Sequence, residues 1–132
     1  MQIRDAFDLP AEVTYATTDV RLAKVNGISD CRALRDYNQT QPLDVIRGLL
    51  ETRRLVKAVS PDIVISTGAA PGLLCLLWAK RSGARTIWLD SIANAEQMSL
   101  SGRLAGLFSD VVLTQWQHLA EGKRIKYWGS VL

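Results

Sequence analysis

The chain is poor in the residues that build metal sites and disulfide frameworks. Its 132 residues include 2 cysteines and 1 histidine, and the cysteines form no Cys-x-x-Cys pair. This leaves too few ligands at suitable spacing for a zinc site. No secretory leader precedes Cys31 or Cys75, so we expect reduced, buried thiols, as in a cytosolic protein.

Long apolar runs and a strong excess of one charge are also missing. The longest charge-free stretch around Cys75, residues 63–79, contains Ser, Thr, Gly and Pro and falls short of the roughly 20 mainly apolar residues that span a bilayer. The net charge is +3, from 16 basic and 13 acidic residues, and the basic residues are dispersed in pairs. Nucleic-acid binding is therefore not expected. Attraction of a basic face to an anionic cytoplasmic leaflet stays open beside the simpler interpretation of solvated helix faces.

The composition is that of one globular domain. Hydrophobic residues make up 48% and charged residues 22%, with 4 prolines, 9 glycines and no biased tract. The length excludes a second full domain, so we treat 1–132 as a single domain.

Hydrophobic periodicity alternates along the chain between strand and helix patterns. Apolar positions 43, 46, 49, 50, 56 and 59 predict the one-sided stripe of an amphipathic helix over 42–59, which begins at Pro42 and ends at Ser60-Pro61. We predict strands at 13–18, 31–34, 63–65, 86–89 and 111–113, a helix at 71–81 and a loop at 19–29. This alternation is typical of an α/β protein with a Rossmann-like, doubly wound parallel sheet.

Ligands of doubly wound sheets bind beyond the carboxyl ends of the strands, which here selects residues 66–72, 90–102 and 114–118. In the first segment a strand leads into a helix start, where backbone N–H groups and the helix dipole favour an anion. Gly68 and Gly72 would let a phosphate approach the backbone, although small residues also suit packing of the helix on the sheet. The segment matches neither a dinucleotide fingerprint nor a P-loop.

The second segment carries a carboxylate and several hydroxyls. Asp90 follows a strand, where it can take a proton from an alcohol or cap the next helix. Ser99 and Ser101 are candidate helix N-caps rather than nucleophiles, because His118 is the sole histidine and no spacing implies a triad. We interpret His118 as a surface or helix-cap group.

Aromatic residues mark the third segment and the carboxyl end. Gln115 and Trp116 directly follow a strand, which places an amide and a large ring at the edge of the sheet or, for the ring, in the core. The stretch 123–132 ends in an apolar run that predicts a last strand.

Five motifs, taken in order, resemble one family. They are Ser66 to Gly72, Leu89-Asp90-Ser91, Leu100-Ser101-Gly102, Ser109-Asp110 followed by Thr114-Gln115-Trp116, and Tyr127-Trp128-Gly129-Ser130. Their order and spacing resemble the asparagine-linked glycosylation protein fourteen family and its bacterial polysaccharide-synthesis relatives. Members are acceptor-binding, membrane-recruiting subunits of a two-chain N-acetylglucosaminyltransferase of lipid-linked oligosaccharide assembly. The likeness runs from about Val13 to Leu132.

The resemblance implies the N-terminal, acceptor half of a GT-B glycosyltransferase that is inactive without a separate donor-binding subunit. The implied reaction transfers N-acetylglucosamine from its UDP donor to a polyprenyl-diphosphate sugar, at the cytoplasmic face of the membrane, with peripheral membrane contact and no cofactor or metal. Asp90 is the implied catalytic residue. The implied acceptor and diphosphate site comprises Thr67, Gly68, Pro71, Gly72, Ser91, Ser99, Ser101 and Gly102. The implied cleft or partner interface comprises Gln115, Trp116, Trp128, Val131 and Leu132.

The chain departs from this family pattern in three places. Asp90 stands where many members carry Glu, and Asn94 stands where many carry Arg, which removes a charged phosphate partner. The pattern begins with a strand and a Gly-Gly-His type loop, whereas Met1 falls inside the following helix, so we expect the first βα unit to be missing and two strand edges to be exposed. A truncated start, a partner strand in the gap and a non-catalytic scaffold that recruits the donor-binding subunit to the membrane are three open explanations.

Overall fold

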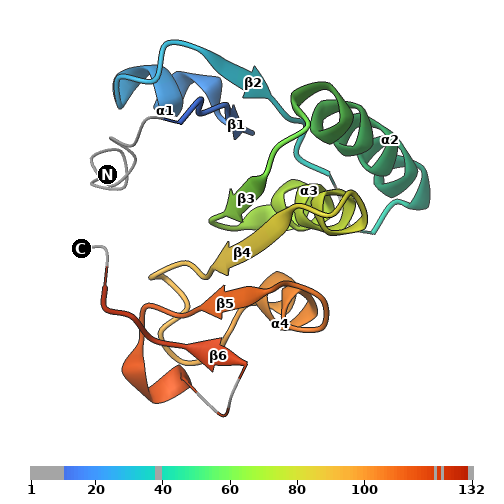
Figure 1. The fold of residues 1–132 in the computed structure, drawn as a ribbon. Helices are drawn as coiled ribbons and strands as arrows, with labels where there is room; N and C mark the ends of the chain where they lie inside the picture. The colour runs from blue at the N-terminus through green and yellow to red at the C-terminus, as the bar shows by residue number, and fades with distance from the viewer. Residues whose placement is uncertain (1–10, 38–39, 121, 123, 131–132) are drawn as a thin grey trace.

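The computed structural model describes residues 11–37, 40–120, 122 and 124–130. Short strands alternate with helices along the chain (Figure 1). The strands are β1 Tyr15–Thr17, β2 Cys31–Ala33, β3 Ile63–Ser66, β4 Arg85–Leu89, β5 Val111–Leu113 and β6 Ile125–Lys126. The helices are α1 Val20–Val25, α2 Pro42–Val59, α3 Ala69–Arg81, α4 Leu100–Ala105 and the 3-10 turn η2 Gln117–Leu119. The helix expected to include residues 2–7 lies outside the described residues.

Every strand pair in the described part of the chain is parallel. β1 pairs with β2, and β3, β4, β5 and β6 form a second sheet in that order. Parallel neighbours require crossover connections, and α3 and α4 supply them between β3 and β4 and between β4 and β5. α2 packs on α3 and α3 packs on α4, so these helices form one layer over the larger sheet (Figure 1). The predicted α/β architecture is confirmed.

The loop predicted over residues 19–29 is wrong at its start, because α1 lies there. Asp19 is its N-cap and accepts a hydrogen bond from the Leu22 N–H at Oδ1, with an N to O distance of 2.9 Å. Ala23 is the only buried residue of the helix. A helix of six residues is too short to show a hydrophobic period in the sequence. The N-cap residue Asp19 was the one local signal for its start.

Three of the six apolar positions predicted as the stripe of α2 are exposed, so the prediction is wrong for these three. The exposed fraction is 69% for Leu43, 53% for Ile46 and 49% for Leu50. Of the six, Val56 is buried as predicted, and the other buried residues of α2 are Gly48 and Thr52, whose hydroxyl donates to the Gly48 carbonyl at 2.7 Å. Small residues at these positions let α2 approach its neighbours closely, because a Cβ at Gly48 would lie 2.6 Å from the Tyr37 ring. The half of α2 nearer its N-terminus therefore presents leucine and isoleucine to solvent.

The core lies between the helix layer and the sheet. One cluster contains Leu76, Trp88, Met98, Ala105 and Val112, and a second contains Val56, Cys75, Ala79 and Ala84. Cys75 is buried, and desolvation raises the pKa of its thiol to about 11, with a smaller contribution from Glu51. Both cysteines are free thiols, but Cys31 is only half-buried, so the expectation of burial is confirmed for Cys75 alone.

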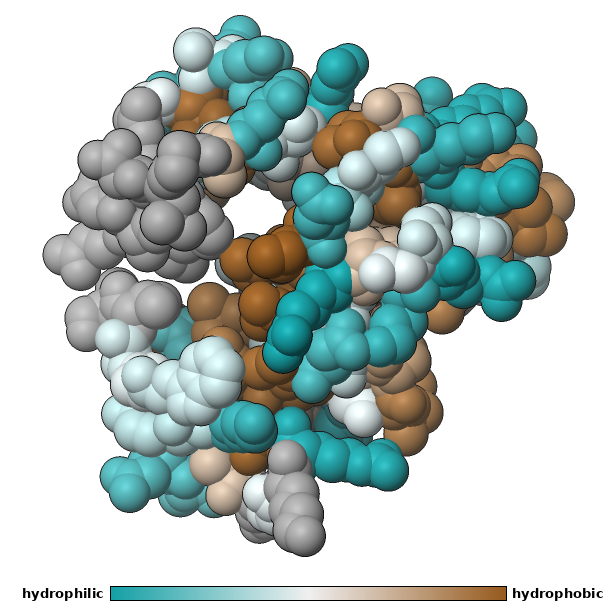
Figure 2. Space-filling view, viewed as in Figure 1, coloured by the Kyte–Doolittle hydropathy of each residue, from teal (hydrophilic) through white to brown (hydrophobic). Residues whose placement is uncertain are grey.

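The face of the larger sheet that points away from the helix layer is partly open. Ile63 and Ile65 of β3 are 57% and 40% exposed, whereas Val64 between them packs against both core clusters. Figure 2 shows apolar surface along the middle of the molecule. β1 and β3 each have an edge that is unpaired among the described residues. None of the helices in the described ranges is long and apolar enough to cross a membrane.

Candidate functional site

The turn after β3 holds the backbone in conformations that few residues adopt. Gly68 has φ +146° and ψ −174°, a region accessible essentially to glycine, and Ala69 has φ +62° in the left-handed region. A Cβ at Gly68 would meet nothing within 4 Å, so this position needs glycine for its conformation and faces open space. The neighbouring Thr67 is exposed. The turn is therefore strained and accessible.

Helix α3 begins in this turn, two residues before the predicted start at Pro71. Pro71 lies in the first turn, where its missing N–H costs no helical hydrogen bond. The N-cap of α3, Gly68, has no side chain that could cap the helix, and its own N–H donates a long hydrogen bond to the Ser66 hydroxyl at 3.5 Å. Because Pro71 has no N–H, the first turn offers the N–H groups of Ala69 and Ala70, which together with the positive end of the helix dipole favour an anion.

The two glycines of this segment have different roles. A Cβ at Gly72 would lie 2.1 Å from the Ser66 hydroxyl oxygen and 3.3 Å from the Ser66 Cβ. Gly72 is therefore required for close packing of α3 on the end of β3. Of the two alternatives stated for the glycines, packing fits Gly72, whereas access for a ligand fits Gly68.

Asp90 follows β4, is 2% exposed and is surrounded by donors. Its carboxylate accepts hydrogen bonds from Trp88 Nε1 at 3.1 Å, Asn94 Nδ2 at 3.2 Å, the Ser99 N–H at 3.0 Å and the Ser99 hydroxyl at 2.6 Å. Two of these bonds close the loop 90–99 onto the start of α4. Because a buried carboxylate without donors is costly, this network fixes the loop in place.

The serines and the glycine at the start of α4 continue this network. Ser99 is the N-cap and accepts from the Gly102 N–H at 2.9 Å, as the capping alternative predicts. A Cβ at Gly102 would lie 2.9 Å from Trp88 Nε1 and 3.0 Å from Asp90 Oδ1, so only glycine fits there without rearrangement. Ser91 accepts from the Ala93 N–H at 3.3 Å.

The loop after β5 braces the loop after β4. Gln115 Nε2 donates to the Asp90 carbonyl at 3.1 Å, and Trp116 Nε1 donates to the Ile92 carbonyl at 2.9 Å. His118 Nε2 lies 2.6 Å from the Ala95 carbonyl. His118 is exposed, as expected, but its contact with the loop was not predicted. A contact between residues 23 positions apart leaves no signal in local sequence.

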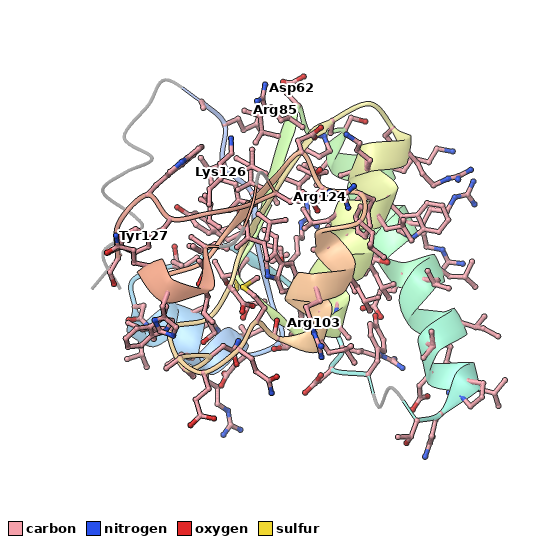
Figure 3. The ribbon with its side chains drawn as sticks, turned by 90° about the horizontal axis from the view of Figure 1, so that it is seen from below. Asp62, Arg85, Arg103, Arg124, Lys126 and Tyr127 are labelled. Carbon is pink, nitrogen blue, oxygen red and sulfur yellow. The ribbon has the colours of Figure 1, made fainter. Side chains whose placement is uncertain are left out.

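These three segments lie at one edge of the sheet. Ser66 is level with Trp88, and Leu89 is level with Leu113, so the loops after β3, β4 and β5 leave adjacent parallel strands together. In Figure 3, Arg103 of α4 lies at this end, whereas Asp62 and Arg85, at the starts of their strands, lie at the other. No group of three or more metal-ligating side chains occurs in the residues described.

The opposite edge carries a different carboxylate. Asp110 pairs with Lys80 and accepts from the Thr86 N–H at 2.8 Å and the Thr86 hydroxyl at 3.1 Å. The hydrogen bond from Lys80, together with those from Thr86, lowers the pKa of Asp110 to about 2. This group ties the starts of β4 and β5 to α3 and lies away from the candidate site.

An apolar pocket of about 200 Å³ opens beside the start of α3. Its lining comes from all three helices of the layer and from the segment before α2, and comprises Tyr37, Val45, Ala70, Leu73, Leu74, Leu100, Ser101 and Leu104. Ser101, expected at the diphosphate site, thus lies on the wall of an apolar pocket. Trp128, expected at a partner interface, is 66% exposed, with the Lys126 ammonium 5.8 Å from its ring centre. Val131 and Leu132 lie outside the described residues.

A parallel sheet covered by helices, with polar groups at its carboxyl edge, is a Rossmann-like architecture. MurG of Acinetobacter baumannii, a solved structure, superposes with a TM-score of 0.73 at 14% identity, over 96% of this chain and 38% of that chain. The family described as "Oligosaccharide biosynthesis protein Alg14 like" matches residues 8–131. The chain belongs to this Alg14-like family, as the motifs indicated.

Two curated relatives carry the same name, "UDP-N-acetylglucosamine transferase subunit ALG14". The relative from Eremothecium gossypii is 32% identical over 78 residues, and that from Candida glabrata is 29% identical over 87 residues. Each match covers 54% of this chain and 35% of the relative. The chain thus spans about a third of the length of these relatives.

Proposed function

We propose that the chain is the acceptor-binding part of a two-chain glycosyltransferase, which transfers N-acetylglucosamine from its UDP donor to a polyprenyl-diphosphate-linked sugar. The names of the relatives support the transferase class and the word subunit supports a partner. The observation that carries the proposal is the uncapped N-terminus of α3, which opens at the same edge as Asp90. The donor-binding partner would complete the second half of the cleft.

The acceptor's diphosphate would bind at the turn after β3. Backbone N–H groups at the start of α3 and the helix dipole supply the attraction, and the exposed Thr67 hydroxyl adds a donor. The open side of Gly68 lets the phosphate oxygens reach the backbone. Asn94, where many members carry Arg, would contribute a dipole but no charge.

Asp90 would act on the acceptor hydroxyl as orienting group or general base. Its carboxylate is buried, so the hydroxyl would replace the amide of Asn94, the longest of its four hydrogen bonds. Ser99 and Trp88 would keep the carboxylate in place while this exchange occurs. A positioned general base contributes about 100- to 10,000-fold in rate.

Trp128 would anchor the donor-binding subunit, because a largely exposed tryptophan beside a cation is typical of interface hot spots. Peripheral contact at the cytoplasmic face of the membrane would bring the complex to its lipid-linked acceptor. The second candidate function is a scaffold that recruits the donor-binding subunit without catalysis. The saturation of the Asp90 carboxylate by donors of its own chain favours it.

The deciding experiment measures lipid-linked product by mass spectrometry after co-expression with the donor-binding subunit. The acceptor-binding proposal predicts product with the wild-type chain and a loss of about 100-fold or more with Asp90→Asn, at equal recovery of the complex. Asp110→Asn is the matched control, because this carboxylate lies at the opposite edge. Unchanged turnover of Asp90→Asn would remove its catalytic role. Recovery of a complex that forms no product would favour the scaffold.

A further inference from the structure

Two helices of the layer, α2 and α4, expose large apolar side chains to solvent. On α2 the exposed residues Leu43, Ile46 and Leu50 lie within two turns. At α4 and just beyond it, Leu100, Leu104 and Leu107 are 57%, 42% and 73% exposed at helical spacing. Clusters of exposed apolar side chains are candidate sites of interaction, in contrast to apolar residues that are exposed singly.

The pocket of about 200 Å³ includes two of these exposed residues, Leu100 and Leu104, and its lining is almost entirely apolar. Ala70, Leu73 and Leu74 of α3 contribute to it, and Leu100 and Leu104 of α4 add to its wall. Of its two polar side chains, Tyr37 already donates its hydroxyl to Glu51 Oε2 at 2.7 Å, and Ser101 has one small hydroxyl. An apolar cavity of about 150 Å³ is large enough to bind benzene, so this pocket has room for a hydrocarbon segment.

The pocket begins where the candidate anion site ends. Ala70 lines it and directly follows the strained pair Gly68 and Ala69. A molecule whose diphosphate sits at the start of α3 would therefore have a hydrocarbon substituent directed along the outer side of that helix. The two sites together match an anionic head joined to an apolar chain.

We infer that this pocket holds the first isoprene units of the acceptor's polyprenyl chain, an inference that rests on the diphosphate site proposed above. Arg103 of α4 is exposed, and its charge complements anionic phosphate groups (Figure 3), whereas Arg47 of α2 already pairs with Asp44 at 3.8 Å. A protein partner is a poorer match for the pocket. Protein interfaces bring roughly one hydrogen bond per 100–200 Å² and aromatic or arginine anchors, whereas this lining is aliphatic with one uncommitted hydroxyl.

The test compares binding of farnesyl diphosphate and inorganic pyrophosphate by calorimetry, with the full chain in complex with its donor-binding subunit. Wild type is expected to bind farnesyl diphosphate at least about tenfold more tightly than pyrophosphate, since burial of apolar groups adds affinity. The double variant Leu100→Ser/Leu104→Ser is expected to lose most of this difference and to keep its affinity for pyrophosphate. Leu107→Ser is the matched control, because Leu107 is more exposed and does not line the pocket.

Two outcomes overturn the inference. Equal affinity of wild type for the two ligands would show that the chain gains nothing from the pocket, and would leave the diphosphate site intact. An equal loss in the double variant and in Leu107→Ser would show that the pocket has no special role. Failure of the proposed function has a separate signature, because it would abolish product formation in the transfer assay whether or not farnesyl diphosphate binds.

Discussion

Two neighbouring loops at the carboxyl edge of the sheet are built in opposite ways. The loop after β4 is held by hydrogen bonds to a buried carboxylate and by a brace from the loop after β5. The turn after β3 has an open glycine, an alanine in the left-handed region and an uncapped helix start. The loop after β4 is held in one conformation, whereas the turn after β3 leaves its backbone groups available to a ligand.

The difference reflects where polar groups find their partners. In the loop after β4, burial lowers the local dielectric and strengthens every bond to Asp90, so the loop has one favoured conformation. In the turn after β3, the strain at Gly68 and Ala69 persists because β3 and α3 fix both of its ends. A substitution in each loop should therefore affect different properties.

The largest expected effect on stability comes from a substitution in the loop after β4. Asp90→Asn places an amide NH2 against donors from Ser99 and Asn94, and we expect the free energy of unfolding to fall by about 2–3 kcal/mol. Urea denaturation measures the change. Asp110→Asn is the control, with an expected loss of about 1 kcal/mol or less, because its carboxylate is partly exposed and screened. An equal loss in both variants would mean that burial of Asp90 does not make its hydrogen bonds more important for stability than those of the partly exposed Asp110.

The next effect tests the packing that joins the turn to its helix. Gly72→Ala drives a methyl group into the Ser66 hydroxyl, and overpacking of this kind costs about 1–3 kcal/mol. Ser66→Ala removes that oxygen and leaves the 3.3 Å contact to Cβ, so the double variant should lose less than the sum of the single variants. Thermal or urea unfolding of the four proteins gives the coupling energy, and strict additivity would contradict the direct contact.

Sequence patterns located the elements better than the contacts between them. The bounds of α2 followed from Pro42 and from Ser60-Pro61, which act locally on the backbone. Which face of α2 is buried depended instead on Tyr37 and α3, so the exposure of Leu43 could not be anticipated.

The same division holds for the candidate site. The position of Asp90 at a strand end followed from periodicity, since a strand pattern stops there. Its enclosure by Trp88 and Ser99 required closure of a loop, and the bracing by His118 required two loops to meet. Neither event leaves a periodic signal. The motifs were sufficient to indicate the family, but they carry no information on these contacts.

The smallest expected effect separates strain that serves binding from strain that does not. Ala69 and Ser60 are the two non-glycine residues with positive φ in the described ranges, at +62° and +47°. Replacement by glycine relieves the left-handed conformation, so Ala69→Gly and Ser60→Gly should each raise the free energy of unfolding by up to about 1 kcal/mol, measured by thermal unfolding.

Ser60 ends α2 and lies outside the candidate site, so its variant should bind inorganic pyrophosphate as wild type does. Ala69→Gly should bind it several-fold more weakly, because a glycine there lets the turn leave the conformation that directs the N–H groups at the start of α3 toward the ligand. Equal affinities of the two variants would mean that the strained turn does not organise the anion site.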